Sequence, residues 1–305
     1  MTATVVTRTA ARVPAHLRRT PRRVAAALAA AALTLPLAAF AAPAAQAHGT
    51  RPQPPAPVTS EYLPGVEADL HLPARPARGR VPVVVMIPGG GWQTADRSGL
   101  GQLAEALAAR GVAVSNATYR ISGEGTRFPV PAQDVRCAVD AGVDAVRRAG
   151  YRPGPVVVLG HSAGAHLSSL AAFGDDAFRT DACPYRPVEI DGWVGLSGIY
   201  DLRVVGQWAW PMMGATAEEA PELYAAAATE TYLVDRPRQH LDALVVQGDA
   251  DELLLDTAVA EDFAALLRDH GYDTRLRIVP GDHNATFQAP VVADHVLSWL
   301  CRVRD

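Results

Sequence analysis

A serine lies in a short turn between an apolar run and a helical stretch, and this feature constrains the fold most. Residues 156–159 are apolar and lead directly into the sequence GHSAG at 160–164, which a helical stretch at 165–172 follows. In a G-x-S-x-G turn between a strand and a helix, the glycines leave room for a strained serine at the edge of a sheet. The helix directs the positive end of its dipole toward a negative charge that develops there. Ser162 is therefore the predicted nucleophile.

Short apolar runs recur along the chain and alternate with helical patterns. Residues 66–71 alternate apolar and polar side chains, which is typical of a half-buried strand. The runs predicted as buried parallel strands are 81–87, 112–119, 156–159, 192–196, 243–246 and 276–279. Between them, 135–146 and 259–267 keep apolar residues on one helix face, and a glycine follows each. This alternation predicts an α/β fold with a mostly parallel central sheet flanked by helices on both faces.

One interval of the chain departs from this alternation. Residues 203–240 contain no strand pattern, but they include Trp208, Trp210 and a helical run at about 218–228. In a sheet of this kind, an insertion after the carboxyl end of a strand lies over the ligand crevice. The interval is therefore predicted to be a short cap-like insertion, and Trp92, Trp208 and Trp210 are the predicted lining of a substrate pocket. The alternative is a surface excursion that packs its own aromatic side chains.

The first 47 residues have the organisation of a secretory signal peptide. A segment with six arginines comes first, an Ala- and Leu-rich run spans 24–42, and the cleavage-type tripeptide AQA occupies 45–47. A transmembrane anchor is the alternative, but it needs about 20 strongly apolar residues. This run is dominated by alanine and contains Pro36. The protein is therefore predicted to be secreted, by Sec or by twin-arginine export, with no membrane span after cleavage.

The rest of the chain is predicted to be one acidic domain. Cleavage after residue 47 leaves 258 residues, which suit a single α/β domain. We expect a mobile Pro-rich linker at 48–60 and a catalytic domain at 61–305. The loss of six arginines and no acid changes the formal net charge from −4 to −10. Such an acidic protein is a poor binder of nucleic acid, so no nucleic-acid partner is expected.

The chain contains three cysteines, an odd number for an exported protein: Cys137, Cys183 and Cys301. One disulfide and one free thiol are therefore expected, and the sequence leaves all three pairings open. A catalytic cysteine is not expected, because none of the three follows a strand in a nucleophile motif.

A serine hydroxyl is a weak nucleophile, so it requires a base, and the base requires a carboxylate that fixes its tautomer. The chain order for this kind of turn is serine, then acid, then histidine. The run at 243–246 is followed by QGDADE, and the run at 276–279 by PGDHN. Asp251 and His283 are the predicted acid and base. Asp249 is the rival acid.

Attack on a carbonyl carbon creates an oxyanion, which preorganised backbone N–H groups stabilise. The apolar run at 81–87 ends in the sequence PGGGW at 88–92, a glycine turn at the same edge of the predicted sheet. Gly90 and Gly91 present N–H groups without obstruction, and Ala163 supplies another next to the serine. A phosphate-binding loop is the competing interpretation of the glycines, but the Gly-Lys-Ser/Thr ending is missing.

Two further histidines flank the nucleophile and have weaker claims to a chemical role. His161 and His166 lie within one turn of Ser162, where packing around the turn is the expected role. No histidine forms a metal-ligand spacing with another, so neither a metal nor any other cofactor is expected.

These residues resemble the α/β-hydrolase superfamily, in its esterase/lipase branch shared by bacterial carboxylesterases and kynurenine formamidase-like arylformamidases. The resemblance covers nearly the whole chain after the signal peptide. Its motifs are GHSAGAHL at 160–167, Tyr119-Arg120 with Phe128-Pro129, SGIYDL at 197–202, the G-x-x-D spacing at 248–251, and GDH at 281–283. It implies the α/β-hydrolase fold and the Ser162–Asp251–His283 triad. Pro88 departs from the His-Gly-Gly start that is usual for the glycine turn, which leaves open which glycine N–H donates.

The predicted function is hydrolysis of small carboxylic esters with short to medium acyl chains, through an acyl-enzyme intermediate. The first alternative is an amidase or arylformamidase, and the second is a non-catalytic binding protein with the same fold. Such binding proteins usually lose the serine, the acid or the histidine, whereas all three occur here in order.

Overall fold

The computed structural model describes residues 53–74, 79–234, 241–253 and 256–303. The predicted signal peptide, its cleavage site and residues 48–52 of the predicted linker lie outside the described residues. In the described part of the chain, no helix is long and apolar enough to cross a bilayer.

An eight-stranded sheet forms the centre of the molecule, in the order β1-β2-β4-β3-β5-β6-β7-β8. The strands are β1 (Val58–Leu63), β2 (Val66–His71), β3 (Val81–Ile87), β4 (Ala113–Ala117), β5 (Pro153–His161), β6 (Gly192–Leu196), β7 (Asp242–Gly248) and β8 (Thr274–Val279). β1 and β2 pair antiparallel with their neighbours, and all pairs from β4 to β8 are parallel. The predicted α/β fold with a mostly parallel sheet is confirmed.

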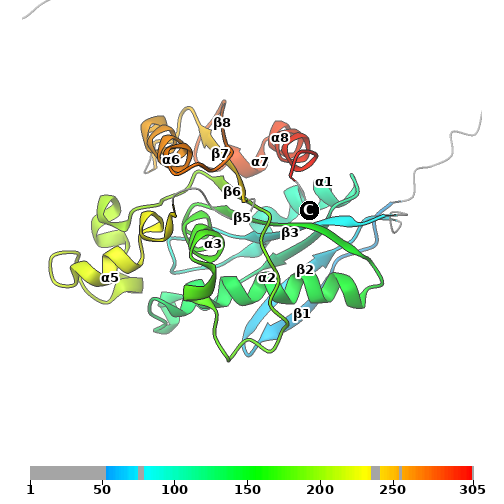
Figure 1. The fold of residues 1–305 in the computed structure, drawn as a ribbon, viewed down its shortest axis with the longest axis horizontal. Helices are drawn as coiled ribbons and strands as arrows, with labels where there is room; N and C mark the ends of the chain where they lie inside the picture. Colours follow the sequence, from blue (N-terminus) through cyan, green and yellow to red (C-terminus); the bar gives the residue numbers. More distant parts are fainter. Residues whose placement is uncertain (1–52, 75–78, 235–240, 254–255, 304–305) are drawn as a thin grey trace, which may run out of the picture. The chain divides into compact units, whose positions relative to one another are not determined.

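Helices cover both faces of this sheet (Figure 1). The helices of four or more residues are α1 (Gly101–Ala108), α2 (Val130–Arg148), α3 (Ala163–Phe173), α4 (Trp210–Met213), α5 (Pro221–Ala226), α6 (Thr257–Asp269), α7 (Ala285–Gln288) and α8 (Pro290–Leu300). Alternate residues of β3 face opposite sides: Val83 and Val85 belong to the hydrophobic cluster that includes residues of α2, α3 and α6, whereas Val84 and Met86 belong to the cluster that includes residues of α1 and α8. Because both faces are buried, the central strands are apolar at nearly every position.

Two strands differ from the sequence prediction. β1 was not predicted, and its first three residues fall within the predicted 48–60 linker, so that linker ends before Val58. β1 pairs with β2 through a hairpin at Gly65, where φ is +78°, and only Tyr62 of β1 is buried. β8 was predicted to be buried, but it is the edge strand, and Ile278 is 41% exposed.

The predicted insertion at 203–240 consists of short helices in its described part. It contains a 3₁₀ segment at Leu202–Trp208, α4, α5 and a second 3₁₀ segment at Thr229–Tyr232, and no strand occurs between 203 and 234. Residues 235–240 lie outside the described residues. The second 3₁₀ segment packs against α3, where Thr229 and Ser169 share a hydrogen bond of 2.6 Å between their hydroxyls.

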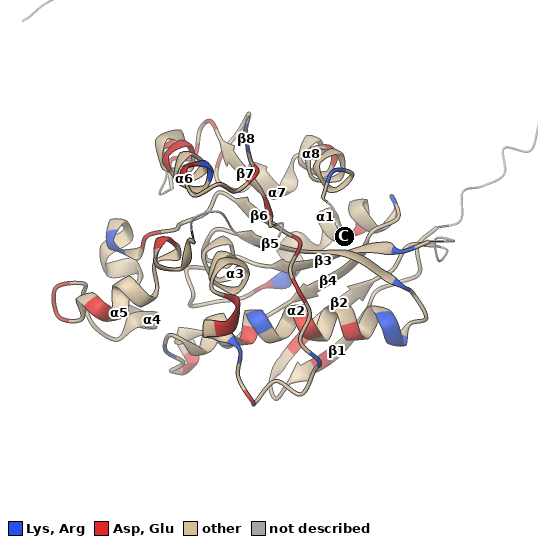
Figure 2. Ribbon diagram, in the orientation of Figure 1, with Lys and Arg blue, Asp and Glu red and all other residues tan. Residues whose placement is uncertain are grey.

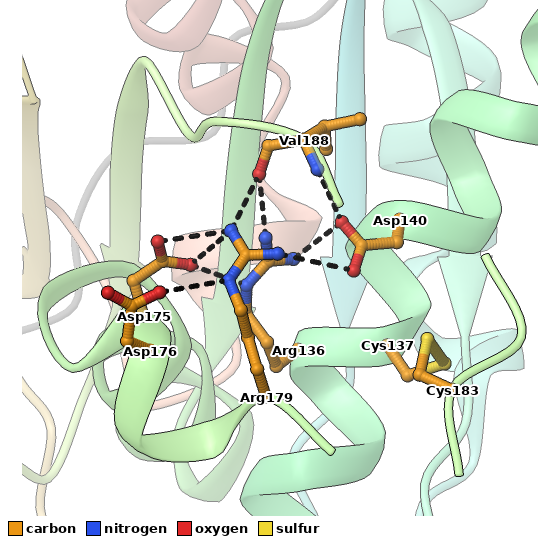
Figure 3. Close-up of polar contacts among 8 residues, drawn as sticks. All are labelled: Arg136, Cys137, Asp140, Asp175, Asp176, Arg179, Cys183 and Val188. Carbon is orange, nitrogen blue, oxygen red and sulfur yellow. Dashed lines mark hydrogen bonds and ion pairs between the residues drawn. A yellow bond between two sulfur atoms is a disulfide. The ribbon is translucent and has the colours of Figure 1, made fainter. Parts of the chain in front are cut away.

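Opposite charges meet on α2, which carries both acidic and basic residues along its length (Figure 2). Four side chains and one backbone segment form a network that we call the Arg136 cluster: Arg136, Asp140, Asp175, Arg179 and the backbone of Val188 (Figure 3). The guanidinium of Arg136 is 1% exposed and donates to Asp140, Asp175 and the carbonyl of Val188 at 2.9, 2.7 and 2.6 Å. Beside the cluster, Cys137 and Cys183 form a disulfide, and Cys301 is an exposed free thiol. The expected one disulfide and one free thiol are present.

Candidate active site

The predicted site residues all follow carboxyl ends of parallel strands, which meet at one edge of the sheet. The glycine turn follows β3, Ser162 follows β5, Asp251 follows β7, and His283 follows β8. Distant segments of the chain are therefore brought together by the parallel pairing alone.

Ser162 occupies a strained turn between β5 and α3. Its φ and ψ are +52° and −120°, a conformation that residues other than glycine rarely adopt. The flanking glycines are required by space: a Cβ atom on Gly160 would lie 2.1 Å from the carbonyl oxygen of Gly164, and one on Gly164 would lie 2.3 Å from that of Ile87. The N–H of Ser162 donates to the carbonyl of Leu196 at 2.9 Å, which ties the turn to β6. The backbone of Ser162 is thus held in one conformation, which fixes the point from which its side chain projects.

Asp251 and His283 form a buried pair beside this turn. His283 Nδ1 lies 2.8 Å from Asp251 Oδ2. Because the carboxylate only accepts, Nδ1 carries the hydrogen, and Nε2 is left with a lone pair that can accept a proton. Asp251 is held in turn by the side-chain amide of Gln247 at 2.8 Å and by the N–H of Leu253 at 3.3 Å.

The rival acid, Asp249, has a different partner. Its Oδ1 accepts a hydrogen bond of 2.9 Å from the N–H of Gly281, at the start of the loop that carries His283. Of the two acids, the structure brings Asp251 to the histidine. Asp249 instead joins the loop after β7 to the loop after β8.

The glycine turn at residues 88–92, which we call the oxyanion loop after its predicted role, follows β3 and lines the same cavity as Ser162. Gly90 has a φ of +128°, and a Cβ atom there would lie 2.2 Å from Thr94 Oγ1. The carbonyl of Gly90 accepts from the N–H groups of Gln93 and Thr94 at 3.1 Å each. Within the described residues, the N–H groups of Gly90, Gly91 and Ala163 donate to no acceptor. Three donors are therefore free to bind an anion near the serine.

His161 packs between the nucleophile turn and the histidine loop. Its Nε2 lies 3.1 Å from the carbonyl oxygen of His283, so this nitrogen is the donor. Its ring also packs against the ring of His283 at 4.7 Å and that of Phe287 at 4.5 Å. Burial, followed by the repulsion of His283, lowers the pKa of His161 to about 3. The ring is therefore neutral near pH 7, in agreement with the predicted packing role.

A cavity of about 420 Å³ opens over Ser162. Its polar lining comes from the oxyanion loop, Gln93, Thr94, Asp96, His161, Ser162, His283 and Asn284, and its apolar lining includes Leu100, Ile199, Trp208, Leu253 and Phe287. Trp208 lies at its mouth and is 52% exposed. The insertion therefore contributes one wall, as predicted. Ile199, Leu253 and Phe287 were not singled out from the sequence, where only their nearness to the SGIYDL, acid and histidine motifs marks them.

The three predicted pocket tryptophans have three different positions. Trp208 lines the cavity, as predicted. Trp92 also borders it, but the residue is only 1% exposed and its indole is directed at His166. Trp210 does not line this cavity; it lies in an adjoining hollow of about 830 Å³ that shares Gln93 and Trp208 with it. A role for Trp210 in substrate binding stays a prediction, because the adjoining hollow is continuous with the cavity at these two shared residues.

No group of three or more His, Cys, Asp or Glu side chains within the described segments is arranged to hold a metal ion. The groups nearest the strained serine are the His283 imidazole with the Asp251 carboxylate and the backbone donors of the glycine turn and Ala163. This combination can remove a proton from the serine and stabilise an anion on a carbonyl oxygen.

The BD-FAE family model matches residues 68–266, a segment that includes Ser162, Asp251 and the oxyanion loop. The chain belongs to the BD-FAE family. This match confirms the predicted membership of the α/β-hydrolase superfamily, in its esterase branch.

Relatives of this family member carry esterase and formamidase names. Esterase LipC of Mycobacterium tuberculosis is 31% identical over 133 residues, which cover 43% of this chain and 32% of LipC. Kynurenine formamidase of Salmo salar is 27% identical over 240 residues, which cover 77% of this chain and 76% of that enzyme. The chain matches about a third of the length of LipC and of other curated esterase relatives. The predicted enzyme class, carboxylic ester hydrolase, agrees with the esterase names.

A solved structure described as a truncated carbohydrate esterase from gut microbiota shares the fold. Its TM-score is 0.67 at 18% identity, over 77% of this chain and 89% of that one. At this identity the likeness concerns the fold alone. The α/β-hydrolase fold predicted from the sequence is thereby confirmed.

Proposed function

We propose that this protein is a carboxylic ester hydrolase that uses Ser162, His283 and Asp251 as a catalytic triad. The observation that carries the proposal is the 2.8 Å pair of His283 Nδ1 and Asp251 Oδ2. It lies at the same sheet edge as a strained serine and three free backbone donors. The BD-FAE match and the esterase relatives support the same reaction class.

Each group has one task in the reaction. His283 Nε2 takes the proton of Ser162 while Oγ bonds to the acyl carbon, and the electron pair of the carbonyl moves to its oxygen. The N–H groups of Gly90, Gly91 and Ala163 stabilise that oxyanion. The oxyanion then re-forms the carbonyl, the C–O bond to the alcohol breaks, and His283 gives its proton to the alcohol. Water repeats the sequence on the acyl-enzyme, releases the carboxylic acid and restores Ser162.

We further propose that the acyl chains are short to medium in length. A cavity of about 420 Å³ with a largely apolar lining lies at the small end of the range for ligand pockets, about 300–1,000 Å³. The insertion supplies only short helices to its wall, and none of those described is long enough to form an extended apolar lid.

An amidase or arylformamidase is the second candidate, and the coverage of the Salmo salar formamidase favours it. The first half of the reaction is the same for both bonds. The difference lies in the leaving group, because an amine is a poorer leaving group than an alcohol and must be protonated as the bond breaks. Comparing an ester with the anilide of the same acid distinguishes the two candidates.

We also propose that the protein is exported, as its first 47 residues predict. The Cys137–Cys183 disulfide supports this location, since disulfides persist in oxidising compartments. Fractionation of producing cells, with N-terminal sequencing of the extracellular protein, tests the export and the cleavage site together.

The test of the activity is hydrolysis of p-nitrophenyl esters from acetate to palmitate by the wild-type protein and Ser162→Ala. We expect turnover that falls at long chain lengths, and we expect the alanine variant to lose at least about 10³-fold of it. Wild-type turnover of anilides at rates equal to those of esters would favour the amidase. No turnover of either substrate, with an unmodified Ser162 after exposure to a fluorophosphonate, would contradict the proposal.

A further inference from the structure

We infer that His166 is a positioning residue for the oxyanion loop: its ring joins Trp92 of that loop to Ala227 of the cap-like insertion. The inference rests on the proposed function, because it concerns the same backbone donors. It assigns a role to two side chains outside the triad; His166 is linked to the serine only through its backbone, whose N–H donates to the carbonyl of Ser162 at 3.2 Å.

His166 lies in the first turns of α3 and is completely buried. Two of its ring atoms have partners on different segments. The indole Nε1–H of Trp92 donates to His166 Nδ1 at 3.2 Å, and His166 Nε2 lies 2.7 Å from the carbonyl oxygen of Ala227. An indole only donates and a carbonyl only accepts, so Nδ1 carries the lone pair and Nε2 carries the hydrogen. Both bonds thus require a neutral ring with one tautomer.

Burial favours the same protonation state. It lowers the pKa of His166 to about 4, and the carbonyl of Ala227 and the charge of Asp201 oppose this only in part. The ring therefore stays neutral near pH 7. A protonated ring would carry a hydrogen on Nδ1, which would face the indole N–H and break the bond to Trp92.

Trp92 is the last residue of the oxyanion loop and is fixed at both its backbone and its side chain. Its φ is +61°, which costs energy for a residue with a Cβ atom. Its carbonyl accepts from both the N–H and the hydroxyl of Ser122 at 2.9 Å each. Its indole meets the ring of His166 edge-on, with centroids 5.6 Å apart. These contacts hold Trp92 in a conformation that its backbone alone would not keep. Gly91 precedes Trp92 in the chain, so the position of its N–H depends on that conformation.

The second partner of His166 belongs to the segment that follows α5. Ala227 is buried, and the next residues of the insertion dock on the same helix through the Thr229–Ser169 hydrogen bond. Through His166, the oxyanion loop and the insertion that contributes Trp208 to the cavity wall share one anchor on α3. The donors are thereby positioned relative to the wall that holds the substrate.

The test compares Trp92→Phe with Trp193→Phe. Trp193 is a matched control: it is buried, and its indole donates to Ser168 on the same helix at 3.0 Å, but it belongs to β6 rather than to the oxyanion loop. Each substitution removes one indole N–H and keeps a ring. We expect Trp92→Phe to lower kcat for p-nitrophenyl acetate about tenfold with KM within about twofold, since misplaced oxyanion donors act on the transition state. Trp193→Phe should leave kcat within about twofold.

A pair of substitutions at His166 separates its two bonds. The amide oxygen of asparagine can occupy the place of Nδ1 and accept from Trp92, whereas the amide nitrogen of glutamine can occupy the place of Nε2 and donate to Ala227. We expect His166→Asn to retain kcat within about threefold of wild type and His166→Gln to lose about tenfold. Melting temperatures of all four variants are measured in parallel. Equal losses in the two His166 variants, or losses that follow melting temperature and include Trp193→Phe, would overturn the inference.

The rate at which a fluorophosphonate labels Ser162 provides a second readout. During this reaction negative charge develops on the phosphoryl oxygen of the reagent, which the N–H groups of the oxyanion loop would stabilise as they do the oxyanion of an ester. If the wild-type protein labels but hydrolyses no ester, the proposed function fails and the labelling rates still compare the variants. Slower labelling of Trp92→Phe than of Trp193→Phe supports the inference. Equal labelling rates for these two variants overturn the inference and leave the ester hydrolase proposal intact.

Discussion

The active-site edge and the Arg136 cluster are both built from buried polar groups, but their backbones and hydrogen bonds differ. Within the described segments, the three residues other than glycine with a positive φ are Trp92, Ser162 and Ser197, and all follow parallel strands at the active-site edge. The cluster contains none of them, and its central guanidinium is bonded through three of its nitrogens. Within the described residues, positive φ values at residues other than glycine are thus confined to the active-site edge.

The two regions differ in what they contribute: the active-site edge provides groups for the proposed reaction, and the Arg136 cluster stabilises the fold. Among the described residues, the N–H groups of Gly90, Gly91 and Ala163 have no acceptor and so add no hydrogen bond to the fold; of these residues Ala163 is buried, Gly91 is half-buried and Gly90 is exposed. In the Arg136 cluster, the guanidinium of Arg136 uses all three of its nitrogens in hydrogen bonds and, with the disulfide, attaches the loop before β6 to α2, whereas Nη1 of Arg179 has no hydrogen-bond partner among the described residues. Substitutions at the two regions should therefore affect different quantities.

The largest expected effect is on catalysis, at Asp251, the acid of the proposed triad. Asp251→Ala should lower kcat by about 10³- to 10⁴-fold, since His283 loses the group that fixes its tautomer. Asp249→Ala is the matched control two residues away, and we expect it to lower kcat less than about tenfold, since it removes only the hydrogen bond to Gly281. Kinetics on p-nitrophenyl acetate and circular dichroism of both variants check this. A larger loss of kcat for Asp249→Ala than for Asp251→Ala would show that Asp249, not Asp251, orients His283.

The next effect is on stability, at the centre of the Arg136 cluster. Arg136→Met should lower the free energy of unfolding by about 3–5 kcal/mol, because Asp140 is left as a buried charge without its nearest partner. Burial already raises the pKa of Asp140, with the attraction of Arg136 opposing it. The control is Arg148→Met on the same helix, whose pair with Asp144 is largely exposed and should contribute at most about 1 kcal/mol.

Urea denaturation gives the free energy of unfolding of both variants. Ester hydrolysis at urea concentrations below the unfolding transition shows whether the active site has changed. We expect kcat of the folded Arg136→Met protein to stay within about twofold of wild type. A loss of activity as large as that of Asp251→Ala would mean that the two regions are coupled, and the division between them would be wrong.

The parts that the sequence predicted correctly are those in which local pattern and local structure agree. The strand at 81–87, the nucleophile turn and the glycine turn each follow from a run of apolar residues that ends in glycines, and a Cβ atom at Gly160 or Gly164 would clash. Parallel pairing then brings the predicted residues to one edge. No side-chain detail is needed for that step.

The parts that were missed depend on tertiary contacts. β1 buries only Tyr62, so its sequence shows no clear apolar alternation, and its pairing with β2 defines it. Trp92 and Trp210 are indistinguishable by residue type, but the indole of Trp92 is bonded to His166 and Trp210 lines the adjoining hollow. The pairing of Cys137 with Cys183 was open because nothing in the spacing of three cysteines selects a partner.

The last expected effect is a dependence of stability on pH, which builds up gradually as the pH falls. His161 and His166 have pKa values lowered to about 3 and about 4 by burial, against 6.5 for an exposed histidine. Between pH 6.5 and 4 the unfolded chain therefore binds protons that the folded protein does not. The stability contribution of these neutral rings is complete above pH 6.5 and is lost as the pH falls, by up to about 1.4 kcal/mol per pH unit for each ring.

Urea denaturation of wild type and His166→Asn at pH 7, 6, 5 and 4.5 tests this dependence. The asparagine variant lacks one of the two rings, so its free energy of unfolding should fall less steeply with acid, although it starts from a lower value at pH 7. Carboxylates titrate in both proteins alike, so the difference between the two slopes isolates His166. Parallel slopes would mean that His166 takes up its proton in the folded protein, and a protonated ring could not accept the hydrogen bond of Trp92. The strained conformation of Trp92 would then have to be held by contacts other than its hydrogen bond to His166, and the inference that His166 positions the oxyanion loop would be wrong.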